Sequence, residues 1–235
     1  MITCTSISCS DIILVCTSLF LGAVALAVAL LPQALDRVIF PPRLHIDFKQ
    51  EVPLCRLTFW RAGASGRRRG PVYAFHLEIS NTGRSTARRC EVVLEGIWRY
   101  DASGKPQRVP DFHPVNVRYG GPGTHFLNLN PGRHLPWNLG HISSAAYQKD
   151  YEQKILWDLP GAPSKGLRFL LDLLEYPNGI PNCLAPGNYA LSLSLYSENA
   201  SPRRLNLKIA WSGRWKKTEA LMFQEIVISK LDSIE

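Results

Sequence analysis

The chain has 235 residues, of which 46% are hydrophobic and 20% charged, with a formal net charge of +8. These proportions are ordinary for a folded protein and exclude wholesale disorder. The charge is uneven, because Asp11 is the only charged residue before Asp36. A basic body of this kind favours anionic neighbours, which include lipid headgroups, nucleic acid and acidic proteins.

The first element is apolar. Residues 1–11 read as a short N-terminal tail and residues 12–35 as a transmembrane helix, since Ile12 to Leu31 is almost purely apolar. Twenty helical residues span about 30 Å, the thickness of a bilayer's hydrocarbon core. A buried core helix would keep a polar stripe, which this segment lacks. A cleavable signal peptide is the alternative, although a basic region before the apolar run is absent.

The charges that flank this segment predict its orientation. No Lys or Arg precedes it, whereas Arg37, Arg43, Lys49 and Arg56 follow within a short distance. The positive-inside rule then predicts a single-pass protein of the cell membrane with its C-terminal domain in the cytoplasm. Cleavage of the segment as a signal would instead place the domain outside the cytoplasm.

Cysteine usage agrees with a reducing compartment. Of six cysteines, Cys55, Cys90 and Cys183 fall after the apolar segment. An odd, scattered set without a CxxC motif is typical of small buried hydrophobic residues. One disulfide with one free thiol remains an alternative.

After a linker at 36–43, residues 44–235 read as an antiparallel immunoglobulin-like β-sandwich. Apolar residues alternate with period two, as in Tyr189, Leu191, Leu193 and Leu195, which predicts strands with one wet face. The predicted strands are 44–48, 55–60, 72–79, 89–98, 125–129, 135–139, 167–176, 188–196, 204–211 and 222–231. A single helix is expected at 145–156. The fold class is therefore mainly β.

Turn residues separate these strands. The stretch Asn81-Thr-Gly83 is expected to cross the end of the sandwich between two core strands, with Cys90, Val92 and Leu94 facing inward on the second. Gly83 and Gly104 are expected to supply the positive φ of tight turns.

This corner carries a resemblance. Asn81, Gly83, Ala87, Val92 and Leu94, with the later Leu129-Asn-Pro-Gly132 turn, resemble CARDB-type and related immunoglobulin-like domains of bacterial envelope proteins over residues 43–231. The stretch 198–215 resembles the end of an uncharacterised bacterial family with one N-terminal membrane helix. The resemblance implies a domain that binds or spaces other molecules, and it brings no catalytic residues.

No motif for catalysis, cofactor binding or metal binding is present, so no enzyme activity is predicted. His113, His125, His134 and His141 crowd one stretch, but their spacing matches no chelating motif and no Asp, Glu or Cys lies among them. His76 is expected at the surface beside Glu78. An enzyme built on the 113–141 loops would require these histidines to converge on a carboxylate in a pocket.

Basic clusters are the strongest surface signal. They form the candidate surface for a protein partner or for lipid headgroups, made of Arg67, Arg68, Arg69, Arg88, Arg89, Arg203, Arg204, Arg214, Trp215, Lys216 and Lys217. Solvated loop charge is the alternative, because arginines at strand ends also discourage edge-to-edge pairing. Nucleic acid is disfavoured, since no recognised nucleic-acid module accompanies Trp211 and Trp215.

The six tryptophans fall into two groups, one expected in the core and one expected at the surface. Trp98, Trp137, Trp157 and Trp211 fall in apolar alternation and are expected in the core, whereas Trp60 and Trp215 adjoin basic residues and are expected to be exposed. The sequence as a whole predicts a membrane-anchored binding or scaffolding module. The alternative is an exported sandwich that binds glycan or envelope polymer.

Overall fold

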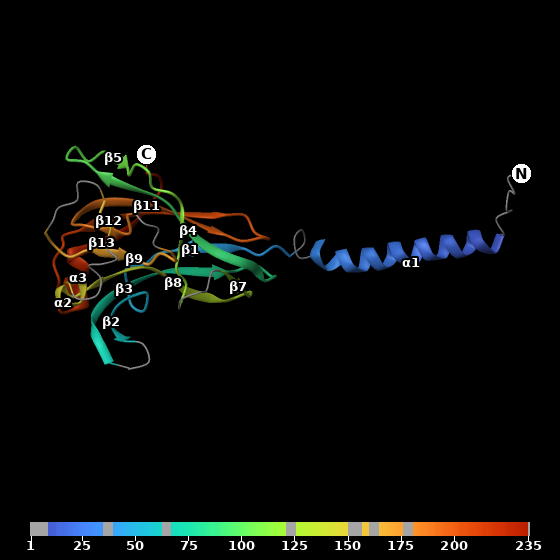
Figure 1. The fold of residues 1–235 in the computed structure, drawn as a ribbon, viewed down its shortest axis with the longest axis horizontal. Coiled ribbons are helices and arrows are strands. Elements are labelled where there is room, and N and C mark those ends of the chain that lie inside the picture. The colour runs from blue at the N-terminus through green and yellow to red at the C-terminus, as the bar shows by residue number, and fades with distance from the viewer. Residues whose placement is uncertain are drawn as a thin grey trace, which may run out of the picture.

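A computed structural model of the protein describes residues 9–34, 40–62, 67–120, 126–149, 157–159, 165–175 and 181–234. The side chains of 9–15, 30–34, 60–62 and 67–69 lie outside this description, as does most of the predicted tail and linker. Helix α1 (Cys9–Ala34) is followed by two antiparallel β-sheets that face each other (Figure 1). The prediction of a mainly β, two-layer body is confirmed.

Among the described residues, six strands make the first sheet. They are β1 (Leu44–Asp47), β2 (Cys55–Ala62), β3 (Arg67–Asn81), β8 (His134–Ser143), β9 (Phe169–Leu171) and β10 (Cys183–Leu184). The long strand β3 pairs with β8 along one edge and with β1 and β2 in succession along the other.

In the same described ranges, seven strands make the second sheet. They are β4 (Ala87–Tyr100), β5 (Pro106–Arg108), β6 (Val115–Val117), β7 (Leu127–Leu129), β11 (Gly187–Tyr196), β12 (Arg203–Trp211) and β13 (Ile226–Leu231). Here β4 is the long strand, with β11 on one edge and β7, β6 and β5 in succession on the other. The corner at 81–87 therefore joins the two long strands, one from each sheet.

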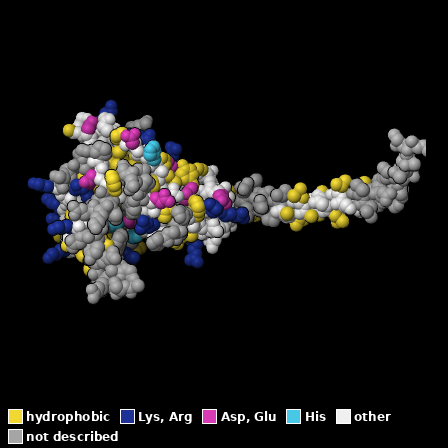
Figure 2. All heavy atoms as spheres, viewed as in Figure 1, with side chains coloured by type: hydrophobic (Ala, Val, Ile, Leu, Met, Phe, Trp, Pro, Cys, Tyr) yellow, Lys and Arg dark blue, Asp and Glu magenta, His cyan; other side chains and the backbone are white. Residues whose placement is uncertain are grey.

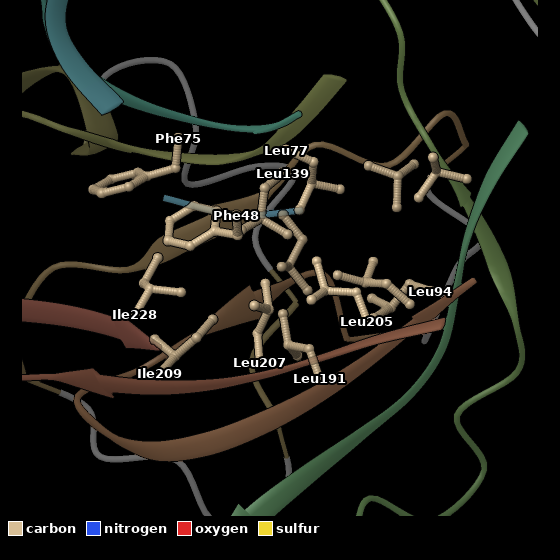
Figure 3. Packing of buried hydrophobic residues seen from close by; sticks show 14 of the residues in the cluster. Phe48, Phe75, Leu77, Leu94, Leu139, Leu191, Leu205, Leu207, Ile209 and Ile228 are labelled. Carbon is tan, nitrogen blue, oxygen red and sulfur yellow. The ribbon is translucent and has the colours of Figure 1, made fainter. Parts of the chain in front are cut away.

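The core fills the space between the sheets (Figure 3). Phe75 and Leu77 of β3 point toward Leu191 and Leu207 of the other sheet, and Phe48 lies between the layers. Their alternation with exposed or half-buried neighbours is the period-two pattern expected from the sequence. Burial of these side chains away from water is the main force that holds the layers together.

Helix α1 lies apart from the sandwich (Figure 1), and every residue from 16 to 29 is exposed. The exposed residues include Leu19, Phe20, Leu21, Val24, Leu26 and Val28. When only the described residues are considered, no helix is long and apolar enough to cross a membrane.

Two expectations about local secondary structure were wrong, and a third is tested only at its start. Residues 219–225 form helix α3 (Glu219–Glu225) ahead of β13, where a strand was predicted from residue 222. These residues are good helix formers, and Met222 and Glu225 bury one helical face. The predicted strand at 167–176 is only three residues long, as β9. The predicted helix at 145–156 begins as α2 (Ala145–Tyr147), and residues 150–156 lie outside the described ranges.

Candidate functional site

Asn81 organises the corner between β3 and β4. Its side chain is fully buried, and its Oδ1 accepts hydrogen bonds from Arg43 N at 3.1 Å and Gly83 N at 3.0 Å. Its Nδ2 donates to Ser85 O at 2.8 Å and Leu129 O at 2.9 Å. One buried amide thus uses both donors and accepts twice, which joins three chain segments at this end of the sandwich.

The corner also holds the chain that arrives from α1. Ser85 Oγ donates to Phe40 O at 2.5 Å, and Thr82 N donates to Arg43 O at 2.8 Å. Gly83 packs so closely here that a Cβ would overlap Arg43 N and lie 2.6 Å from Pro41 O. The expectation of a positive φ at Gly83 was wrong: its small size is needed for close approach, whereas Gly104 does have a φ of 79°.

Arginines gather at this end of the body, which we call the basic end. It consists of the chain segments 40–44, 81–89, 130–133 and 197–204, which carry Arg43, Arg84, Arg88, Arg89, Arg133, Arg203 and Arg204 against a single carboxylate, Glu198. Hydrogen bonds connect these segments: Arg203 Nε donates to Leu44 O at 3.2 Å, and Glu198 N donates to Arg88 O at 3.1 Å. All seven arginines are exposed.

Arg89 has an unusual local geometry. Its φ is 49°, a left-handed value at an irregularity in the pairing of β4 with β7. Its Nε lies 2.9 Å from Glu198 Oε1, and its guanidinium carbon lies 4.2 Å from the centre of the Phe126 ring. These contacts place a cation beside an aromatic ring that is 42% exposed.

Two recesses open at the basic end. One, of about 490 Å³, is lined by Phe40, Arg84, Ser85, Thr86, Arg88 and Pro131, none of which is acidic. The other, of about 550 Å³, is lined by residues of the 41–44 and 198–203 segments, and Glu198 stands there beside Arg43 and Arg203. The first recess therefore has the more uniform positive lining.

The remaining candidate residues lie at the opposite end of the sandwich, the far end, so the predicted surface is divided in two. Figure 2 shows Lys and Arg side chains at both ends. Arg214 Nε and Lys216 Nζ lie 2.9 Å and 3.1 Å from the Glu225 carboxylate. Hydrogen bonds from Ser212 and Lys216, with the charge of Arg214, hold the pKa of Glu225 below its ordinary value. Lys217 is exposed, and the side chains of Arg67, Arg68 and Arg69 lie outside the description.

Trp215 is half-buried rather than fully exposed. Its ring packs on Tyr73 with ring centroids 4.9 Å apart, and Tyr73 OH donates to Lys216 O at 3.2 Å. Trp211 is 3% exposed and its Nε1 donates to Leu167 O at 2.9 Å, so this ring offers no face to a nucleic-acid base.

The other tryptophans follow the sequence pattern only in part. Trp137 is buried and donates from Nε1 to Val117 O at 2.9 Å. Trp98 is half-buried under Arg108, whose guanidinium carbon lies 5.7 Å from the ring centre. Trp157, expected in the core, is 43% exposed. The side chain of Trp60 is not among those described.

A groove of about 330 Å³ opens beside β2, β3 and β8. It is lined by Pro53, Leu54, Arg56, His76, Glu78, His134, Leu135 and Pro136. His76 Nδ1 donates to Leu54 O at 2.8 Å, and His134 Nδ1 lies 3.0 Å from Glu78 Oε1. The groove combines apolar walls with a few polar groups, as small binding sites do.

The described histidines of the 113–141 stretch do not converge. His113 is exposed, whereas His141 is buried and its Nδ1 lies 2.8 Å from Asp172 Oδ1 inside the body. His125 lies outside the description, and of the three described histidines of this set only His134 lines the groove. In the described part of the chain, no group of three or more His, Cys, Asp or Glu residues could hold a metal ion.

The cysteines of the body are free thiols. Cys55, Cys90 and Cys183 are all buried. Burial raises the pKa of the Cys55 thiol to about 12 and that of Cys90 to about 11, and it raises the pKa of Cys183 further. The interpretation of these residues as small buried hydrophobic groups is confirmed.

Three arginines of the basic end were missed as surface residues by the sequence analysis. Arg84 and Arg133 each follow an Asn-x-Gly turn, and Arg43 follows a proline pair that leads into β1. Alternate turns of an antiparallel sandwich lie at the same end, so counting turns would have placed Arg84, Arg133 and Arg203 together.

No protein-family model matches the chain, and no curated protein matches it. Among solved structures, the chain is similar to a crystal structure of a Bordetella pertussis protein provisionally described as ApaA, at 16% sequence identity and a TM-score of 0.27. That similarity covers 71% of this chain and 89% of the other.

Proposed function

We propose that the protein is a single-pass membrane protein in which α1 anchors an immunoglobulin-like sandwich, and that the sandwich is a binding or scaffolding module in the cytoplasm. The observation that carries the proposal is the apolar helix. Leu21, Leu26 and Val28 expose about two thirds of their surface each. A helix that is apolar all round and has no protein cover is stable only in lipid or against a partner.

The orientation is supported by the flanking charges and by the thiols. The basic side chains that follow α1 favour the cytoplasmic side of the bilayer. The buried, unpaired Cys55, Cys90 and Cys183 are compatible with a reducing compartment.

A binding role for the body is supported by a groove on its surface. The groove beside β2 and β8 offers Leu54 and Leu135 as apolar contacts, with His76 and His134 as polar ones. A peptide or loop of a protein partner, with an apolar side chain and a polar group, suits this lining.

The anchor is tested by membrane extraction of the full chain at alkaline pH. The native chain should stay with the membrane, whereas Leu21→Asp with Leu26→Asp should release it, because each carboxylate near the helix centre costs about 3 kcal/mol. A matched control places the same two charges on exposed apolar residues of the body, as Val52→Asp with Leu221→Asp. Release of the native chain would refute the anchor.

Orientation requires a separate measurement. A reporter fused to the C-terminus should be active only in the cytoplasm, and activity only outside would overturn that part of the proposal. A mature chain that lacks residues 1–29 would instead establish the exported sandwich.

A further inference from the structure

We propose that the recess of Arg84, Ser85, Thr86, Arg88, Phe40 and Pro131 binds the phosphate of an anionic phospholipid headgroup. The basic end then rests on the bilayer surface from which α1 emerges. This inference rests on the anchor proposed above and adds which end of the sandwich meets the lipid and which residues recognise it.

Chain connectivity restricts the distance between the recess and α1. Five residues separate Ala34, the last residue of the helix, from Phe40, which lines the recess. Six peptide units span at most about 20 Å when fully extended. With α1 in a bilayer, Phe40 therefore stays within about 20 Å of the end of the helix, whichever way the body turns.

Hydrogen bonds fix the recess to that point of the chain. Ser85 Oγ donates to Phe40 O, and Arg43 is held through both its N and its O by Asn81 and Thr82. The loop that carries Arg84 and Arg88 is therefore attached to the segment that leaves the helix. The recess therefore keeps its place beside Phe40, and these bonds would have to break before it could move farther from α1 than that segment.

The chemistry of the recess fits a phosphate. Arg84 and Arg88 present guanidinium groups, which bind phosphate oxygens in a bidentate manner, and no lining residue is a carboxylate. Its volume of about 490 Å³ exceeds that of a phosphate group and leaves room for part of the headgroup.

Aromatic side chains at the same end suit an interface. Phe40 is 39% exposed and Phe126 is 42% exposed, and Arg89 lies over the Phe126 ring. Apolar rings among arginines are typical of surfaces that lie at the boundary between headgroups and acyl chains.

The described residues of the far end do not show this combination. Arg214 and Lys216 are paired with Glu225, and Trp215 packs against Tyr73. The far end is also separated from α1 by the length of the sandwich (Figure 1). A lipid-binding role thus belongs to one of the two basic surfaces.

The test is mass spectrometry of the intact full chain with bound lipid, released from neutral detergent micelles to which phosphatidylserine or phosphatidylcholine has been added. The native chain should retain phosphatidylserine in preference to phosphatidylcholine. Arg84→Ala with Arg88→Ala should reduce that preference by about 25-fold, since each arginine near a lipid surface contributes about fivefold.

A control variant removes the same charge elsewhere. Lys105→Ala with Lys165→Ala changes two exposed lysines outside the basic end and should leave the preference unchanged. An equal loss in both variants would mean that net charge alone attracts the lipid, which overturns the recess as the site. No preference in the native chain also overturns it.

Two further measurements distinguish lipid from free phosphate as the ligand, and failure of this inference from failure of the anchor. Millimolar inorganic phosphate should not displace the bound phosphatidylserine, and complete displacement would identify the ligand as free phosphate instead of lipid. Membrane extraction of the Arg84→Ala, Arg88→Ala variant should match that of the native chain, because α1 is intact. Loss of extraction resistance in the native chain refutes the anchor, whereas loss of lipid preference alone refutes only this inference.

Discussion

Gln50 closes the outer edge of β13 at Ile228. Its Oε1 accepts a hydrogen bond from Ile228 N at 2.6 Å, and its Nε2 donates to Ile226 O at 2.6 Å. On β2, Glu219 Oε1 likewise accepts a bond from Leu57 N at 2.7 Å. Both strands end their sheets in the described part of the chain, so these side chains occupy backbone groups that would otherwise be open to another strand.

The first prediction concerns this edge. Gln50→Ala should lower the free energy of unfolding by about 2 kcal/mol, because two backbone groups lose their partner. It should also raise self-association, measured by light scattering of the full chain in detergent. Gln224→Ala on the exposed side of α3 is the control and should change neither quantity. A Gln50→Ala chain that is as stable and as monomeric as the native one would contradict this explanation.

The second prediction concerns the buried amide of Asn81. Asn81→Ala should destabilise the body by about 4 kcal/mol in urea unfolding, since four hydrogen bonds of about 1 kcal/mol each are lost. Asn81→Asp keeps the two acceptor contacts to Arg43 N and Gly83 N but loses both donors, so it should fall between the native chain and Asn81→Ala. Asn188→Ala, at an exposed position of β11, should have little effect. Equal effects of Asn81→Ala and Asn188→Ala would show that the corner is not held by this amide.

The third prediction concerns Trp215, whose substitution distinguishes a structural role of the ring from a role in partner binding. Trp215→Ala should reduce the free energy of unfolding by about 2 kcal/mol, because the packing of its ring on Tyr73 is lost. Trp215→Phe should restore much of that stability. If Trp215→Ala leaves unfolding unchanged but abolishes capture of a partner, the ring is a binding residue and the structural interpretation is wrong.

Alkaline pH should weaken the fold through its buried thiols. The pKa of Cys90 is raised by burial from its ordinary 9.0 to about 11 in the folded chain. The unfolded state therefore binds fewer protons above pH 9, and the stability from this thiol is complete below pH 9 and is lost as pH rises to about 11. That loss amounts to about 3 kcal/mol.

Urea unfolding between pH 8 and pH 11 measures this effect. Cys90→Ala lowers stability at every pH, because it removes core volume, but it should make the decline above pH 9 less steep. Alkylation at pH 8 should leave Cys55, Cys90 and Cys183 unmodified until the chain unfolds. A decline with the same slope in Cys90→Ala would assign it to other groups.

Much of the fold could be predicted from the sequence because the longer strands alternate strictly. Residues 188–196 and 204–211 match β11 and β12 to within one residue at each end. Strands of two or three residues, such as β5 and β10, are too short to show a period. In α3 the adjacent apolar residues Met222 and Phe223 are compatible with a strand or a helix, because the stretch is so short. Packing of Met222 into the core favours the helix.

For the basic surface, the sequence predicts which kinds of residue are present but not how they are arranged. Arginine clusters are visible in the sequence, but their division between two ends depends on which turns lie together. Gly83 is the clearest example: its role comes from the approach of Pro41 and Arg43, about forty residues away, and local turn chemistry gives no sign of it.

The corner at 81–87 connects the longest strand of one sheet to the longest strand of the other, and it also holds the segment that arrives from α1. A pulling force applied to the helix would therefore act on the sandwich at the corner where its two sheets are connected. The load would be shared between β3 and β4 and their neighbours instead of peeling β1 away first. A sandwich joined to its helix in this manner resists unravelling from the point where the helix is attached.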